Sequence, residues 1–132
     1  MSILEYAEDL TNAEPPVPLP VGPYPAEIIS AQEKQGAAGR YINVIFRINS
    51  ESYPADYTEG DPDGLELHYN RLQSEDTGRN RFRIRQFCER IGAPLSNRID
   101  TNVWMGLTAT VEVTHQEYEG EQRAQIARIL AP

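Results

Sequence analysis

Cysteine and lysine are almost absent from this chain of 132 residues, which contains only Cys88 and Lys34. One cysteine excludes an internal disulfide framework and a zinc site built on several thiolates. No apolar run approaches the roughly 20 residues that a membrane-spanning helix needs. The first residues lack a charged start followed by an apolar stretch, so we expect no signal peptide and a cytoplasmic protein without membrane contacts.

Motifs for catalysis and metal binding are also missing from the sequence. His68 and His115 lie far apart, and no serine or cysteine motif accompanies either of them. No Gly-x-Ser-x-Gly, phosphate-binding loop or His-Glu-x-x-His pattern occurs. The acidic loop 50–64 lacks the glutamate that completes a calcium-binding EF-hand loop. We therefore expect a protein that is not an enzyme and that holds neither a metal nor a cofactor.

Charge is distributed unevenly along the chain, whose net charge is -8. Residues 71–98 contain seven arginines against three carboxylates, which gives this segment a local balance of +4. Arginine binds phosphate through its planar guanidinium and stacks on bases. Two interpretations remain open: a basic surface that binds a partner, or a solvated helix face without a ligand.

The N-terminal residues 1–23 are expected to form an arm. The first ten have the spacing of one or two turns of amphipathic helix. Five prolines then follow between Ala13 and Pro23, which excludes helix and favours an extended backbone. The domain is expected to begin at Tyr24 and to extend to residue 132.

Alternation of apolar and polar residues predicts five strands in this domain, over residues 24–34, 40–49, 65–72, 107–118 and 121–130. In the clearest strand, the apolar residues that share one face are Ile42, Val44, Phe46 and Ile48.

One helix is predicted over residues 80–92, because the apolar residues Ile84, Phe87, Cys88 and Ile91 form a single stripe. Cys88 is therefore interpreted as a buried structural thiol, and Trp104 is assigned to the core. The side of the helix opposite the stripe is expected to carry Arg79, Arg83 and Arg90.

The order of three strands, a helix and two strands predicts a mostly β protein, an OB-fold-like barrel of five strands with the helix between strands 3 and 4. Each strand is apolar on one face only, and closure of the sheet would remove its exposed edges. The alternative is a five-stranded, sandwich-like roll with the helix packed on one face.

OB-folds bind oligonucleotides on strands 2 and 3 and between the loops that join strands 1–2 and 4–5. Stacking aromatic residues interleaved with cations are typical of single-strand binding without sequence preference. This surface contains the candidate nucleic-acid-binding residues Lys34, Arg40, Tyr41, Asn43, Arg47, His68, Asn70, Arg71, Tyr118 and Arg123. The alternative interpretation makes Tyr41 an ordinary strand residue and Arg47 a solvated charge.

Several segments resemble a family of small bacteriophage proteins: Pro18–Ile28, Gly39–Phe46, Phe87–Pro94 and the closing segment from Trp104 to Gly120. The resemblance covers roughly residues 15–130. It implies a single-stranded DNA-binding OB-fold protein of a replication or recombination cluster, acting in the host cell cytoplasm. This chain departs from the family in its acidic loop 50–64 and in its scarcity of lysine.

The sequence therefore predicts a phage protein that binds single-stranded DNA without sequence preference. The alternative is a structural or protein-interaction module, such as a virion component or an assembly adaptor. In that case the arm and the arginine-rich helix would contact other phage proteins. Either function is compatible with a homo-oligomer.

Overall fold

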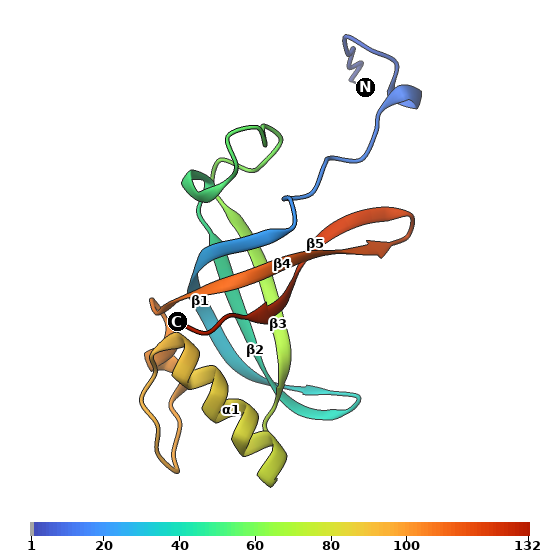
Figure 1. The fold of residues 1–132 in the computed structure, drawn as a ribbon. Helices are drawn as coiled ribbons and strands as arrows, with labels where there is room; N and C mark the ends of the chain where they lie inside the picture. Colours follow the sequence, from blue (N-terminus) through green and yellow to red (C-terminus); the bar gives the residue numbers. More distant parts are fainter. Residues whose placement is uncertain (1) are drawn as a thin grey trace.

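Residues 2–132 form one five-stranded antiparallel sheet and one α-helix in the computed structural model (Figure 1). The strands are β1 (Gly22–Gly36), β2 (Gly39–Ile48), β3 (Leu65–Gln73), β4 (Thr108–Tyr118) and β5 (Glu121–Ile129). They lie in the order β3-β2-β1-β4-β5, and α1 (Gly78–Ile91) follows β3 in the chain. Within the described range, no helix is both long enough and apolar enough to cross a membrane.

All five predicted strands and the predicted helix are present, with ends within two residues of the expected ones. The mostly β fold is therefore confirmed. The alternation of apolar and polar residues located the strands because the apolar residues of each strand share one buried face. In β2, for example, Ile42, Val44, Phe46 and Ile48 are all 5% exposed or less.

The long strand β1 organises the sheet, because it pairs with a different neighbour along each half. Its residues Gly22–Glu27 pair with β4, and its residues from Glu27 to Gly36 pair with β2. The pairing with β2 shifts register between Ile28 and Ser30. A bulge of this kind bends a strand and increases its twist. The sheet therefore curls, so that its two edge strands approach each other.

The edge strands β3 and β5 are not joined by a strand ladder, so the expected closed barrel does not form. One arginine of β3 and one of α1 reach β5 in its place. Arg71 Nη1 donates a hydrogen bond to the carbonyl of Ala127 at 2.6 Å, and Arg90 Nη1 donates one to the carbonyl of Ile129 at 2.8 Å. Long side chains thus satisfy β5 carbonyls that a neighbouring strand would otherwise have bound. We call this gap the β3–β5 seam.

Helix α1 packs its apolar stripe on the core beside the seam. Thr77 caps its start by accepting a hydrogen bond from the Asn80 backbone, and Gly92 ends it with a positive φ of 76°. The Phe87 ring lies 5.2 Å from the Trp104 ring, and both residues are buried. Cys88 is buried as expected, and Trp104 belongs to the core as predicted.

The N-terminal arm is fixed to the domain only near its end. Leu19 is buried, and its carbonyl accepts a hydrogen bond from His115 Nε2 at 2.7 Å. The Tyr57 hydroxyl donates to the Val17 carbonyl, and Glu59 accepts from the Val17 backbone. The acidic loop 50–64 and residues of β1 and β4 therefore together hold residues 17–20, which we call the strap.

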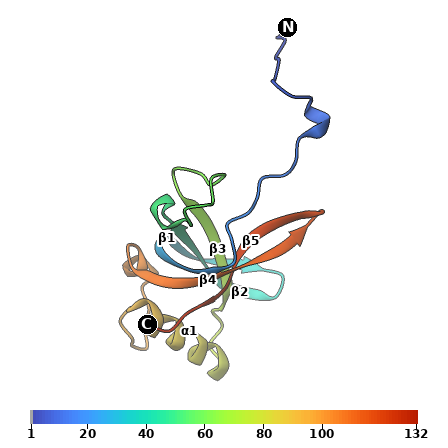
Figure 2. The same ribbon diagram turned by 45° about the horizontal axis from the view of Figure 1, so that its top comes forward.

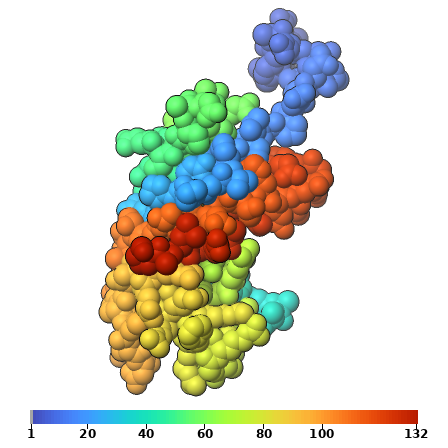
Figure 3. All heavy atoms as spheres, viewed as in Figure 1, coloured from blue at the N-terminus to red at the C-terminus, as the bar shows by residue number. Residues whose placement is uncertain are grey.

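Residues 2–16 extend away from the domain and are exposed to solvent (Figures 1 and 3). The amphipathic helix considered for the first ten residues does not form, and a single 3-10 turn spans Leu10–Asn12. So short a helix is marginal in water without a surface to pack on. Met1 lies outside the described residues. The last residues of the expected arm, from Gly22 onward, belong to β1.

Candidate nucleic-acid interface

The β1–β2 hairpin carries three of the candidate residues. Lys34 pairs opposite Tyr41, and Arg40 is next to them. The Tyr41 ring lies against the hairpin backbone, so closely that a Cβ on Gly36 would come within 2.9 Å of its Cε1 atom. This contact fixes one side of the ring and leaves Tyr41 half-exposed.

The Arg40 charge is already compensated. Its Nε lies 3.6 Å from Glu75 and its Nη1 lies 3.9 Å from Glu33. The Arg40 backbone also donates a hydrogen bond of 3.0 Å to Glu75, and this bond lowers the pKa of the Glu75 carboxyl. Glu75 therefore stays ionised beside Arg40, which reduces the attraction of that arginine for phosphate.

The outer face of β2 and β3 carries Asn43, His68 and Asn70. Asn43 Nδ2 lies 3.1 Å from His68 Nδ1, and Asn43 is only 7% exposed. The sequence indicated an outward, accessible Asn43, but this residue lies at a register shift in the β2–β3 pairing and is buried beside His68. His68 and Asn70 are exposed, as a ligand-binding role requires.

Arg47 lies between two carboxylates on the same outer face. Glu27 of β1 and Glu66 of β3 occupy the register positions on either side of it. Arg47 Nη2 is 3.3 Å from Glu27 Oε1. A phosphate group that approached Arg47 would therefore meet both carboxylates, which makes this arginine a poor phosphate anchor.

The β4–β5 hairpin carries Tyr118 and Arg123. The Arg123 guanidinium lies 4.8 Å from the centre of the Tyr118 ring, and it is also 3.8 Å from Glu121. The hairpin turns through Glu119 and Gly120, which both have positive φ angles as tight hairpin turns require. Tyr118 is 54% exposed, so its ring remains accessible to a planar ligand.

The two hairpins project toward the same side of the molecule, and β3 runs between them (Figures 1 and 2). The structure therefore separates the candidate residues into two hairpin groups and the outer face of β2 and β3. Arg71 lies apart from these groups, at the β3–β5 seam.

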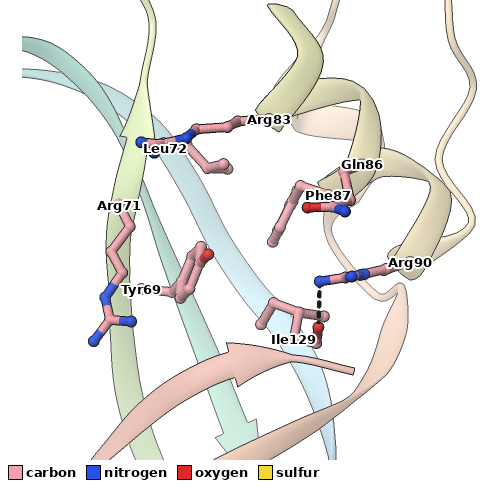
Figure 4. A pocket seen from close by; sticks show the side chains of 8 residues that line it. All are labelled: Tyr69, Arg71, Leu72, Arg83, Gln86, Phe87, Arg90 and Ile129. Atoms are coloured by element: carbon pink, nitrogen blue, oxygen red, sulfur yellow. Dashed lines mark hydrogen bonds between the residues drawn. The ribbon is translucent and has the colours of Figure 1, made fainter. Parts of the chain in front are cut away.

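A pocket opens in this seam, between β3, β5 and α1 (Figure 4). Its volume is about 260 Å³. We call it the seam pocket, and it is lined by Tyr69, Arg71, Leu72, Arg83, Gln86, Phe87, Arg90 and Ile129. In Figure 4 the Arg83 side chain extends from α1 toward β3, and Arg90 extends toward Ile129.

The three arginines of the seam pocket differ from those described above in their partners. Arg71 and Arg90 bind backbone carbonyls, which fix their positions but carry no net negative charge. None of Arg71, Arg83 and Arg90 forms an ion pair within residues 2–132. Three positive charges therefore border one pocket without a carboxylate to offset them.

Aromatic residues form a wall of the same pocket. The Tyr69 and Phe87 rings are stacked, with centres 5.7 Å apart and planes 12° from parallel. Burial raises the pKa of the Tyr69 hydroxyl, and the charges of Arg71, Arg90 and Arg83 act in the opposite direction. The Tyr69 hydroxyl is therefore neutral at physiological pH and lies within the positive field of the pocket.

Sequence reasoning missed Tyr69, Arg83 and Arg90 as site residues. It placed Arg83 and Arg90 opposite the apolar stripe, and the structure shows that this placement was wrong. The spacing contained the signal, since Arg83, Phe87 and Arg90 follow the i, i+4, i+7 pattern of one helix face. Both arginines therefore flank the apolar stripe at the edge that faces the seam.

The remaining reactive groups form no second site. Burial raises the pKa of the Cys88 thiol to about 11, so the thiol is neutral and enclosed in the core. Residues 2–132 contain no group of three or more side chains arranged to hold a metal ion. No family model matches the chain, and no curated protein matches it at a significant level.

Proposed function

We propose that this protein binds single-stranded DNA, with the seam pocket as its principal phosphate-binding site. The observation that carries the proposal is that Arg71, Arg83 and Arg90 all line one aromatic-walled pocket and that none of them forms an ion pair within residues 2–132. Guanidinium groups bind phosphate oxygens through several parallel N–H donors. Arg71 and Arg90 each use one donor on a carbonyl, which leaves the others available.

Two tyrosines of the hairpins extend this site along the bound DNA strand. Tyr118 on one hairpin and Tyr41 on the other flank β3, and both rings present a face to solvent. Bases stack on aromatic rings regardless of their identity, which gives affinity without sequence preference. In this proposal the sugar-phosphate backbone of the DNA follows the β3–β5 seam, and the bases of the DNA contact the tyrosines of the hairpins.

The strand order supports an OB-fold for this chain. The edge strands β3 and β5 face each other, as they do where an OB-type barrel closes, and the helix lies between β3 and β4 in the chain. OB barrels are often partly open. Together with the resemblance to small phage proteins, this supports a role in phage DNA replication or recombination in the host cytoplasm.

A protein-interaction module is the second candidate function. The observation that favours it is the exposed arm, which displays large apolar side chains and carboxylates that nothing in the domain covers. Such a segment is typical of contacts with another protein chain. Within one copy, the arm and the seam pocket lie in different parts of the molecule (Figure 1).

The test is fluorescence anisotropy with a labelled oligothymidine about 30 nucleotides long, measured at several salt concentrations. Three neutralised phosphates predict a slope of about −2 in the plot of log affinity against log salt. Arg83→Ala is expected to weaken binding about tenfold, because it removes one uncompensated charge.

The matched control is Arg85→Ala. This residue lies on the same helix, but it forms an ion pair of 2.8 Å with Glu89. It should change the affinity by less than about twofold. Absence of binding at low salt, or equal effects of the two substitutions, would overturn the proposal.

A further inference from the structure

The arm combines exposed apolar side chains with charge of a single sign. Ile3, Leu4, Tyr6 and Leu10 are between 62% and 82% exposed. Residues 2–16 also contain four carboxylates and no lysine or arginine. Large apolar side chains that stay in water cost free energy, which is recovered when a partner covers them. The arm therefore has the composition of a segment that docks on a basic and partly apolar surface.

The strap determines where the arm leaves the domain. Buried Leu19 and the hydrogen bonds of Val17 to Tyr57 and Glu59 fix the chain at this point. From there the arm extends away from α1 in both views (Figures 1 and 2). The surface that the arm covers is therefore to be sought on another molecule.

The surface around the seam pocket has the complementary chemistry. Arg71, Arg83 and Arg90 supply positive charge, and Arg79 on the preceding turn of α1 also forms no ion pair in the described part of the chain. Apolar side chains also line the pocket, among them Leu72, Phe87 and Ile129. A second pocket, lined in part by Glu27 and Arg47, contains an arginine that is already paired with a carboxylate.

We propose that the arm of one copy docks on the seam pocket of a second copy of this chain. The carboxylates of the arm would pair with the pocket arginines, and the apolar side chains of the arm would cover the aromatic wall of the pocket. Fifteen extended residues span up to about 50 Å, which is enough to reach a neighbouring domain of this size. Because the arm and the pocket are different surfaces, the contact is head-to-tail and leads to rings or chains.

Self-association of this kind is tested by sedimentation velocity over a range of protein concentrations, without nucleic acid. The full chain should form oligomers, and added salt should weaken them, because the contact is partly ionic. A chain that begins at Pro15 keeps the strap and should be monomeric. The same result is expected when the arm carboxylates are neutralised in the variant E5Q/E8Q/D9N/E14Q.

Substitutions on the pocket side complete the test. Arg83→Glu should weaken association by about tenfold or more, whereas Arg85→Glu, which is outside the pocket, should leave it nearly unchanged. Fluorescence of the buried Trp104 reports whether each variant is folded. A full chain that is monomeric at all concentrations, or oligomers that persist without the arm, would refute the proposal.

A charge-swap experiment distinguishes this contact from general attraction. One chain carries Arg83→Glu, and the other carries E5K/E8K/D9K/E14K. Each variant alone should be impaired, but the mixture should associate, because the acidic arm of the first matches the intact pocket of the second. No gain on mixing would contradict the assigned contact. Since no oligonucleotide is present, the result does not depend on the proposed DNA binding.

Discussion

The outer face of β2–β3 and the β3–β5 seam both present arginine on the same sheet, yet their charges are available to very different degrees. On the outer face, Arg47 lies between Glu27 and Glu66 and is paired with Glu27 at 3.3 Å. In the seam, Arg71 and Arg90 bind carbonyl oxygens of β5. Both surroundings hold the guanidinium in place, but only the carboxylates offset its charge. The identity of the partner atom thus decides which arginine can attract an anion.

The largest effect that separates the two regions is expected in folding stability. Arg90→Met keeps the alkyl chain but leaves the carbonyl of Ile129 without its donor. Loss of a partner for a partly buried carbonyl costs about 1–2 kcal/mol. Arg47→Met removes an exposed ion pair and should cost less than about 0.5 kcal/mol. Urea unfolding followed by Trp104 fluorescence measures both values, and equal losses would remove the structural distinction between the two arginines.

A smaller effect is expected on the affinity for single-stranded DNA when the carboxylates beside Arg47 are removed, so that the outer face resembles the seam. In the variant E27Q/E66Q, Arg47 would lose both neighbouring charges and become free to attract phosphate. Its affinity for oligothymidine at low salt should rise about threefold. The control E51Q/D63N neutralises two carboxylates in the exposed loop 50–64 and should change affinity less. An unchanged affinity for E27Q/E66Q would show that charge compensation does not explain the difference.

The smallest expected effect concerns the titration of Tyr69. Arg71, Arg90 and Arg83 oppose the rise that burial causes in the pKa of its hydroxyl. Removal of a cation destabilises the phenolate, so Arg83→Ala should raise this pKa further, whereas Arg47→Ala should leave it unchanged. A pH titration of the Tyr69 ring carbon by NMR measures the shift. A fall in pKa for Arg83→Ala would contradict the described field.

The local spacing of apolar and polar residues was sufficient to predict the strands and the helix of this fold, but not how they pair and pack. Alternation located every strand because each strand buries one face, and i, i+3, i+4 spacing located α1. The compensation of the Arg47 charge depends on which residues face Arg47 on the two neighbouring strands. The periodicity of a single strand does not reveal the register in which it pairs with its neighbours. The seam is a property of three elements that meet only after folding. Arg83 and Arg90 were the exception, since their helical spacing already placed them beside Phe87.

The strap has a mechanical consequence for any partner that holds the arm. Tension applied to the arm passes through Leu19 and the strap directly into β1, whose first residues, Gly22–Glu27, pair with β4 and whose later residues pair with β2. A pull along a strand loads many of its inter-strand hydrogen bonds at once in shear, whereas a pull across the strand opens them one at a time. A load along the arm is therefore shared by the whole β1–β4 ladder before it reaches the rest of the sheet.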